Sequence, residues 1–229
     1  MKRIIASFII SLCISSSFAQ FISTEKLLLQ KDSLYGGTSW KKIATQIKSN
    51  LPINEEKDVV YTKIVDLPNT DSDKIFDILR YWVIDNFSGS NSIIKVMDKD
   101  IGRIVIEDYI DKIVRKGEFA LSDDVSLKPL IRIDIQDNKV RIMCTNSVYY
   151  VHQITYAGFT PISNDYQYKI TKCYPMVKTS EREIGAFYIT DNKSACKAFS
   201  LIHISSLLYL NEIEKVLTKD TCLSNKNSW

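Results

Sequence analysis

The stretch that decides the fold is VVYTKIVDLPNTDSDKIFDILRYWVIDNF, residues 59–87. Its first nine residues are rich in β-branched side chains and stop at Pro68, which predicts a strand. Thr70 then offers a capping oxygen and Asp73 follows three positions later, so we expect a helix to begin there. Apolar side chains recur at helical spacing at Ile75, Leu79, Trp82 and Val83. We expect this helix to end at Ser88-Gly89, because glycine readily takes the left-handed cap geometry.

Shorter segments with strand-like patterns follow this helix. Residues 93–97 are apolar and predict a strand, and residues 98–102 are a turn. Residues 103–114 alternate apolar and polar side chains, which predicts one further strand. The polar run at residues 122–124 indicates a loop.

The clearest hairpin covers residues 131–144. Every second residue from Ile131 to Ile135 is an isoleucine, with polar side chains between them. Asp137-Asn138 suits a two-residue turn, because both residues tolerate positive φ. The return strand alternates in the same way, so we expect the Cys144 thiol to lie on the buried face.

The rest of the chain is arranged around these elements. Residues 20–57 are an N-terminal leader that we expect to be partly helical. Residues 58–217 form a single α+β domain, with a tyrosine-rich β insertion at 152–192 and a closing helix at 193–217. Residues 218–229 are polar and predict a loose tail. The order of strand, helix, four strands and helix predicts a curved antiparallel sheet with both helices on one face.

Four segments have a recognisable combination of motifs: Val65-Asp66-Leu67-Pro68, the helix containing Tyr81-Trp82 and Asn86-Phe87, the turn at residues 98–102, and Lys139-Val140-Arg141-Ile142. Together they resemble DUF4468, a domain of unknown function. The resemblance covers about residues 58–151. It implies a fold like that of the TATA-binding protein (TBP-like) and an exported protein of Bacteroidota. It implies no catalytic residue, because the family has no established activity.

Residues 1–19 have the features of a secretory signal. A short positive head precedes an apolar run, and Ser17-Phe18-Ala19 presents small residues at the positions that a signal peptidase recognises. We predict cleavage between Ala19 and Gln20, and a periplasmic or secreted protein. Cys13 lies inside the apolar run behind a leucine, where a lipoprotein signal needs a small residue, so we expect no lipid anchor.

Charge and hydropathy narrow the classes of partner. Cleavage would remove Lys2 and Arg3 and leave 28 basic against 27 acidic residues, a net charge of +1. Phosphate binding needs a concentrated basic face, so we expect no nucleic-acid partner. The longest apolar run after residue 19 is 202–210, and it is interrupted by His203 and two serines. We therefore expect no membrane span.

Four cysteines remain after cleavage. With Cys144 in the core, at most one disulfide is expected, among Cys173, Cys196 and Cys222. No two cysteines have C-x-x-C spacing, which argues against a redox or zinc motif. We expect no metal and no cofactor.

Signals of catalysis are weak. His203 lies beside the apolar stripe of the last helix, where a hydrogen-bonded histidine at the edge of the core is the simpler interpretation than a base or a metal ligand. His152 follows a strand end, where an exposed ring is ordinary. Glu107, Asp108 and Asp111 could supply the paired carboxylates of a hydrolase, although solvated strand faces often carry such groups. We therefore assign no catalytic residue.

Tyrosine is the more distinctive feature, since seven of the twelve tyrosines lie between residues 149 and 188. Tyrosine gives a binding surface rigid contact area with a polar tip. The candidates for partner binding are Tyr149, Tyr150, Tyr156, Tyr166 and Tyr168. Adjacent strand residues point to opposite faces, so half of each pair would face the core instead.

The sequence therefore favours an exported, non-enzymatic module that binds an unidentified protein or glycan partner in the cell envelope. The alternative is an envelope or polymer hydrolase that uses paired carboxylates as acid and base.

Overall fold

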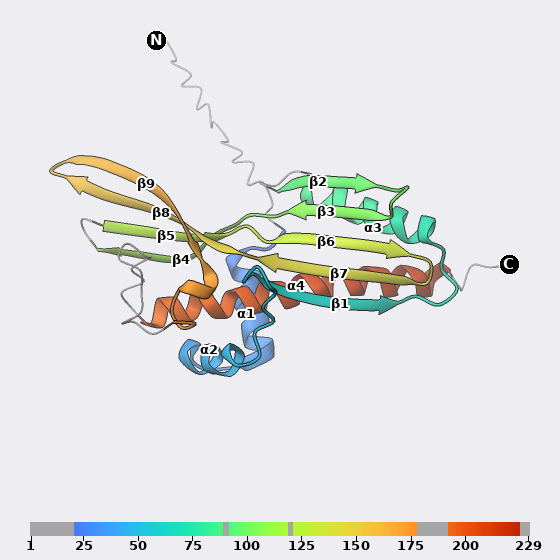
Figure 1. Cartoon of the computed structure of the whole chain (residues 1–229), viewed down its shortest axis with the longest axis horizontal. Coiled ribbons are helices and arrows are strands. Elements are labelled where there is room, and N and C mark those ends of the chain that lie inside the picture. Colours follow the sequence, from blue (N-terminus) through green and yellow to red (C-terminus); the bar gives the residue numbers. More distant parts are fainter. Residues whose placement is uncertain (1–20, 89–91, 119–120, 178–191, 225–229) are drawn as a thin grey trace, which may run out of the picture.

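The computed structural model describes residues 21–88, 92–118, 121–177 and 192–224 (Figure 1). Two antiparallel sheets lie end to end along the long axis, with the helices packed against them. The helical elements are α1 (Thr24–Tyr35), α2 (Trp40–Lys48), α3 (Ser72–Phe87), the 3₁₀ turn η1 (Ile170–Lys172) and α4 (Asn192–Ser224). The strands are β1 (Val59–Asp66), β2 (Ile93–Asp98), β3 (Arg103–Glu107), β4 (Ile110–Glu118), β5 (Leu121–Leu127), β6 (Leu130–Gln136), β7 (Lys139–Asn146), β8 (Val148–Ala157) and β9 (Thr160–Lys169).

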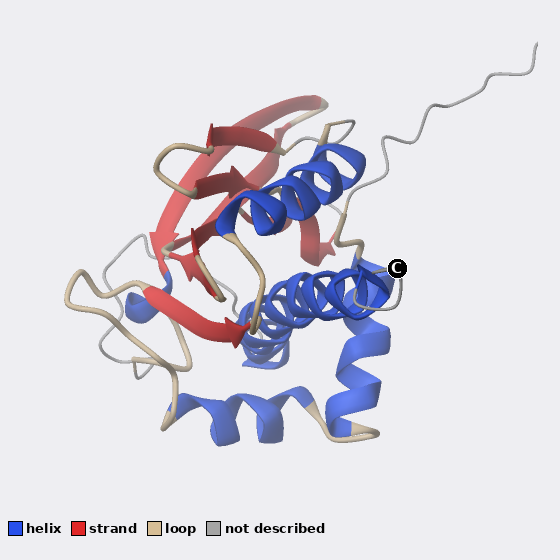
Figure 2. Cartoon of the chain, turned by 90° about the vertical axis from the view of Figure 1, so that its right-hand side faces the viewer, coloured by secondary structure: helices blue, strands red, loops and turns tan. Residues whose placement is uncertain are grey.

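The five-stranded sheet has the order β1-β7-β6-β3-β2, and every neighbouring pair is antiparallel. Helices α3 and α4 cover one of its faces (Figure 2). Every second side chain of the central strands points to that face and is buried: Ile104, Ile106, Ile131, Ile133, Ile135 and Ile142. The predicted α+β fold, with both helices on one face of an antiparallel sheet, is confirmed.

The hairpin of β6 and β7 also forms as predicted. Gln136 pairs with Lys139, which leaves Asp137-Asn138 as the two-residue turn, and Asn138 has φ +62°. The Cys144 side chain is fully buried, and its Sγ lies 3.6 Å from Ser206 Oγ of α4. Burial raises the pKa of this thiol to about 12, so it stays protonated and unreactive.

The prediction of one strand over residues 103–114 is wrong. These residues form β3 in the five-stranded sheet and β4 in a second, four-stranded sheet of order β4-β5-β8-β9. The chain leaves the first sheet at Asp108. The alternation of side chains continues across this break, which is why the pattern looks like that of a single strand.

The prediction of a loop at residues 122–124 is also wrong, because these residues belong to β5. Asp123 and Asp124 are buried within the sheet. Gln153 of β8 donates to Asp123 at 2.9 Å, and Arg115 of β4 pairs with Asp124 at 3.1 Å. Polar side chains that pair with neighbouring strands in this way cannot be told from loop residues in one sequence.

Helix α3 lies where it was predicted, with a different N-cap. The capping residue is Asp71, whose carboxylate accepts from the Lys74 N–H at 2.7 Å, and not Thr70. The backbone N–H of Thr70 instead donates to the side chain of Asn138 in the β6–β7 turn. The C-cap is Ser88, and Gly89 lies outside the described residues.

The leader is partly helical, as predicted, and it is an integral part of the fold. Helices α1 and α2 both pack on α4, and α1 also contacts β4. Ile22, Leu27, Ile43 and Ile47 are buried in these contacts. Residues 1–20, which include the predicted signal and cleavage point, lie outside the described residues.

His203 of α4 joins the leader to the sheet. Its Nε2 lies 2.9 Å from the Tyr35 hydroxyl of α1, and its Nδ1 lies 2.6 Å from the Tyr61 hydroxyl of β1. Burial lowers the pKa of His203 and raises the pKa of both tyrosines. The neutral ring can donate to one tyrosine and accept from the other, so the interpretation as a hydrogen-bonded histidine at the edge of the core agrees with its placement.

This arrangement gives a pH-dependent stability. Because the folded protein holds the pKa of His203 below 6.5, the unfolded chain takes up the proton first as the pH falls. We expect the free energy of unfolding to fall between about pH 7 and pH 5, and more steeply in the wild type than in His203→Gln. Urea titrations at several pH values measure this difference. Parallel curves for the two proteins would contradict it.

The C-terminal helix is longer than predicted. It runs to Ser224, so the loose tail does not begin at residue 218. No proline or glycine interrupts residues 218–224, which allows the helix to continue through them. Residues 225–229 and part of the insertion, 178–191, lie outside the described residues.

The buried cysteines Cys144, Cys173 and Cys196 are not joined to one another by a disulfide, and the side chain of Cys222 lies outside the described residues. No described helix is both long and apolar enough to cross a lipid bilayer.

Candidate functional site

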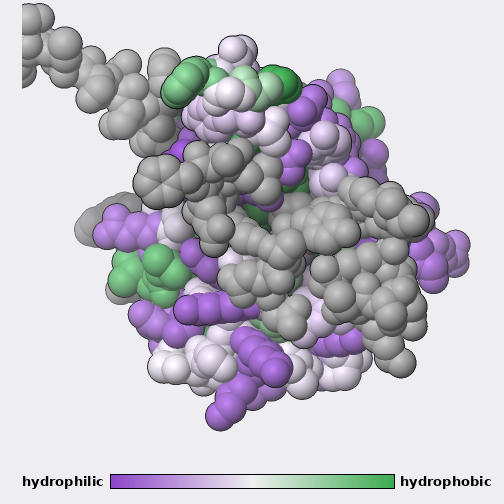
Figure 3. Space-filling model, turned by 90° about the vertical axis from the view of Figure 1, so that its left-hand side faces the viewer, coloured by the Kyte–Doolittle hydropathy of each residue, from purple (hydrophilic) through white to green (hydrophobic). Residues whose placement is uncertain are grey.

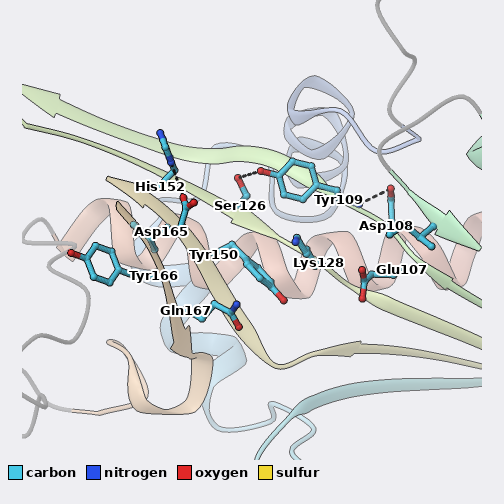
Figure 4. Close-up of a pocket in the computed structure, with 12 residues that line it drawn as sticks. Glu107, Asp108, Tyr109, Ser126, Lys128, Tyr150, His152, Asp165, Tyr166 and Gln167 are labelled. Carbon is cyan, nitrogen blue, oxygen red and sulfur yellow. Dashed lines mark hydrogen bonds and ion pairs between the residues drawn. The ribbon is translucent and has the colours of Figure 1, made fainter. Parts of the chain in front are cut away.

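Three connections between the sheets meet at one seam. The chain passes from β3 to β4 at Asp108, from β5 to β6 at Lys128-Pro129, and from β7 to β8 at Ser147. The Asp108 N–H donates to the Pro129 carbonyl at 3.0 Å, which ties the first connection to the second. An open cleft of about 540 Å³ lies at this seam (Figure 4). We call it the seam cleft, and its functional groups include Glu107, Tyr109, Lys128, Tyr150, His152 and Gln167.

Lys128 lies between two tyrosine rings in this cleft. Its Nζ is 4.4 Å from the ring centre of Tyr150 and 5.7 Å from that of Tyr109. Among the described residues, no Asp or Glu oxygen lies within salt-bridge distance of this ammonium group, so the aromatic faces are its main support. Burial, and then the negative charge of Glu107, raise the pKa of Tyr150. Its hydroxyl therefore stays protonated and can donate to a ligand.

Tyr109 is fixed by polar groups on its far side. Its hydroxyl donates to Asp111 Oδ1 and contacts Ser126 Oγ, both at 3.2 Å, and Ser126 also donates to Asp111 at 3.1 Å. Burial is the main cause that raises the pKa of Tyr109. These hydrogen bonds fix the Tyr109 ring in the position where it contacts Lys128. They also occupy Asp111, which is not part of the cleft lining.

Asp108 supports the floor of the seam and faces the core. It is 1% exposed and accepts hydrogen bonds from the Ser92 hydroxyl, the Tyr209 hydroxyl of α4, and the Tyr109 N–H at 2.8 Å. A buried carboxyl group needs such donors, because an unsatisfied one is costly. Asp108 therefore fixes the sheet connection to the long helix.

The other acidic side chains of the cleft are also engaged. Glu107 pairs with Lys95 at 3.4 Å, and Asp165 pairs with His152 Nδ1 at 2.7 Å. The His152 side chain is 46% exposed, in agreement with the expected exposed ring. His203 lies in the contact with Tyr35 and Tyr61 and is not part of the cleft lining.

The predicted tyrosine group is split between the two faces of the second sheet. Tyr149 is 1% exposed and packs in the core, so the expectation that it contacts a partner is wrong. Tyr150 points the opposite way, into the seam cleft (Figure 4). The cause is the alternation of side chains along β8, which sends neighbouring residues to opposite faces.

The remaining candidates lie along the β8–β9 hairpin. Tyr166 and Tyr168 share the face of Tyr149, with their ring centres 6.0 Å apart, and Tyr168 packs against the core. Tyr166 reaches the rim of the cleft, but its ring points away from Tyr150 (Figure 4). Tyr156 is exposed near the end of the hairpin. Of the five candidates, only Tyr150 therefore points into the cleft.

Sequence reasoning missed Lys128, Ser126 and the role of Tyr109 as a wall of the cleft. Lys128 precedes a proline at a strand end, which is a common and uninformative context. Ser126 lies in the strand whose start was predicted to be a loop. The usable signal was Asp108, which falls in the apolar register of Ile104, Ile106 and Ile110.

No group of three or more histidine, cysteine, aspartate or glutamate side chains is placed to hold a metal ion within the described part of the chain. The groups of the cleft are donors, acceptors and aromatic faces, which suit a polar organic ligand.

The sequence profile described as a domain of unknown function (DUF4468) with TBP-like fold matches residues 61–150. Over these residues the chain is similar to the DUF4468 family. The matched residues include both tyrosines whose rings contact Lys128, since the match contains Tyr109 and ends at Tyr150. Most of the β8–β9 hairpin lies beyond the matched DUF4468 residues.

Two solved structures are similar to this chain. A TBP-like protein from Parabacteroides distasonis is 17% identical, with a TM-score of 0.52, and the match covers 73% of this chain and 97% of that one. A DUF4468 family protein from Bacteroides ovatus is 10% identical, with a TM-score of 0.45, and the match covers 72% of this chain and 89% of that one. No curated protein matches the chain. The first likeness shows a shared fold.

Proposed function

We propose that this chain is an exported, non-enzymatic binding module whose seam cleft holds a neutral saccharide. The observation that supports this most is the pair of tyrosines around Lys128 in an open cleft of about 540 Å³. A cleft of this size accommodates a small ligand. The signal-like residues 1–19 support the proposed export.

The mixture of polar groups favours a ligand with hydroxyl groups. Glu107 offers acceptor oxygens, Lys128 and the Tyr150 hydroxyl offer donors, and Gln167 offers both. A saccharide hydroxyl both donates and accepts, so it can use either kind of group. The rings of Tyr109 and Tyr150 add apolar area against the C–H face of a sugar.

The state of the carboxyl groups weighs against the hydrolase alternative. Glycoside hydrolysis needs two carboxyl groups that face one scissile bond across the site. Here Asp108 is buried and accepts a hydrogen bond from Tyr209, and Asp111 accepts one from Tyr109. Asp165 is paired with His152. Each is engaged with a neighbouring side chain, which leaves Glu107 with no matching acid in the cleft.

A saccharide-binding measurement tests this proposal. The labelled chain without residues 1–19 is applied to an array of oligosaccharides, and the affinity for any saccharide that binds is then measured by titration. We expect Tyr150→Ala to weaken that binding by about tenfold or more, because truncation of a central tyrosine commonly costs over 1 kcal/mol. Tyr81→Ala is the matched control, since Tyr81 is an exposed tyrosine on α3.

Binding of no saccharide, or equal binding by wild type and Tyr150→Ala, would overturn the proposal. Release of new reducing ends during a long incubation would instead favour the hydrolase.

A further inference from the structure

The β8–β9 hairpin projects from the body of the protein (Figure 1). Its turn is Gly158-Phe159, since Ala157 pairs with Thr160. Gly158 has φ +66° and the following residue does not have positive φ, the pattern of a type II′ turn. This turn fits the twist of the strands, so it holds Phe159 at the outermost point of the hairpin, where the ring is fully exposed.

The end of this hairpin carries no charge. None of the twelve residues 153–164 is Asp, Glu, Lys or Arg, whereas charged residues make up 25% of the whole chain. The hydrogen bond between His152 and Asp165 marks the border of the uncharged part. We call residues 153–164 the hairpin tip.

Apolar side chains occupy both faces of the hairpin tip. The strand register places Ile154, Tyr156 and Pro161 on one face and Ile162 on the other, with Phe159 at the turn. Tyr156 and Ile162 are both about half exposed. Figure 3 looks onto this end of the molecule and shows hydrophobic side chains gathered at the top of the view, over the end of the hairpin. A socket on another protein would favour apolar side chains on one face alone, whereas the hairpin tip carries them on both faces and at its turn, with uncharged polar side chains between them.

We propose that the hairpin tip inserts into the interfacial layer of a lipid bilayer and holds the protein at a membrane surface. The four steps from Ile154 to Gly158 extend about 13 Å at the usual rise of a strand, and interfacial segments enter about 5–10 Å. Tyrosine suits this layer because its ring is apolar and its hydroxyl can meet water, and phenylalanine adds apolar area that enters the layer.

The edge of the hairpin is consistent with lipid rather than with strand addition by a partner protein. Among the strands that the structure describes, β9 is the last of its sheet, and none of them pairs with its outer edge. Pro161 removes one N–H donor from this strand, which weakens a template for pairing. The same absence of a donor lowers the cost of entering a layer with little water.

The charge of the tip selects the type of membrane. With no Lys or Arg among residues 153–164, the tip has no means of attracting anionic headgroups. We therefore expect binding to electrically neutral vesicles, with little dependence on salt. This inference does not depend on the ligand of the seam cleft.

Flotation with phosphatidylcholine vesicles tests the proposal, with the chain that lacks residues 1–19, because that apolar run would itself bind lipid. We expect the wild type to float with the vesicles, equally at about 50 mM and about 500 mM NaCl. We expect Phe159→Ser to bind about tenfold more weakly. Ile64→Ser is the matched control, because Ile64 is also exposed but lies on the five-stranded sheet.

A second measurement reports the position of the tip. The indole fluorescence of Phe159→Trp is expected to shift to shorter wavelength when phosphatidylcholine vesicles are added. The proposal is overturned if the wild type does not bind these vesicles, as expected for a tip that enters a protein socket. It is equally overturned if Phe159→Ser binds as well as the wild type, or if binding requires anionic lipid and disappears at high salt.

Discussion

Replacement of Asp108 by alanine is expected to lower the free energy of unfolding by about 3 kcal/mol. The Asp108 side chain is buried and accepts hydrogen bonds from Ser92, Tyr209 and Tyr109. Its removal leaves the buried Tyr209 hydroxyl without this acceptor and opens a small void at the seam. Urea unfolding measures the effect, and an unchanged slope with a lower midpoint would show that only stability has changed.

A double-mutant cycle assigns this effect to one contact. Tyr209→Phe removes the hydroxyl that donates to Asp108 and is expected to cost about 1–2 kcal/mol. Because the two side chains are in contact, the double variant should cost less than the sum of the single variants. Asp111→Ala is the matched control on the same seam, with an expected cost of about 1 kcal/mol or less, since Asp111 is partly exposed. Additive costs for Asp108 and Tyr209 would contradict the contact.

The position of Asp108 also shows how far the sequence predicts this fold. Period-two alternation predicts the β6–β7 hairpin correctly, because one face of these strands is buried along their whole length. The same alternation runs from Ile104 through Asp108 to Ile110, although the chain changes sheet within it. A polar residue in a buried register marks the break, but only the packing shows which strands it then joins.

The second sheet escapes prediction for a related reason. Its strand β5 buries Asp123, Asp124 and Ser126, whose composition is that of a loop. Their partners come from the neighbouring strands β4 and β8, so no pattern within β5 itself reveals that these side chains are paired.

The candidate site is predictable only in part. The cluster of tyrosines directs attention to β8, and the alternation of Tyr149 with Tyr150 shows that one of them must face the core. The register with β5 decides which one, since it pairs Tyr149 with the apolar Leu127 and Tyr150 with the polar Ser126. Lys128 lies in the site only because three connections between the two sheets meet there, and that meeting is a property of the fold.

Replacement of Gly102 by alanine is the second change with a large expected effect, a loss of about 2–4 kcal/mol in the free energy of unfolding. Gly102 follows β2 in the tight turn to β3 and has φ +61°, a conformation that strains any residue with a Cβ atom. An added Cβ would lie 2.5 Å from the Ile135 carbonyl oxygen of β6. The Ile135 N–H also donates to the Gly102 carbonyl at 2.7 Å, so the backbone cannot move away without weakening a bond in the central sheet.

Variants at two other glycines separate the cost of positive φ from the cost of the close contact with β6. Gly158 has φ +66° with no atom within 4 Å of an added Cβ, so Gly158→Ala should show the conformational cost alone, about 1 kcal/mol. Gly37 has neither positive φ nor a close neighbour, so Gly37→Ala should leave the midpoint of urea unfolding nearly unchanged. The difference between Gly102→Ala and Gly158→Ala then measures the close approach of β6 to the turn. Equal midpoints for these two variants would mean that the turn relaxes freely, and that the sheet does not hold Gly102 in place.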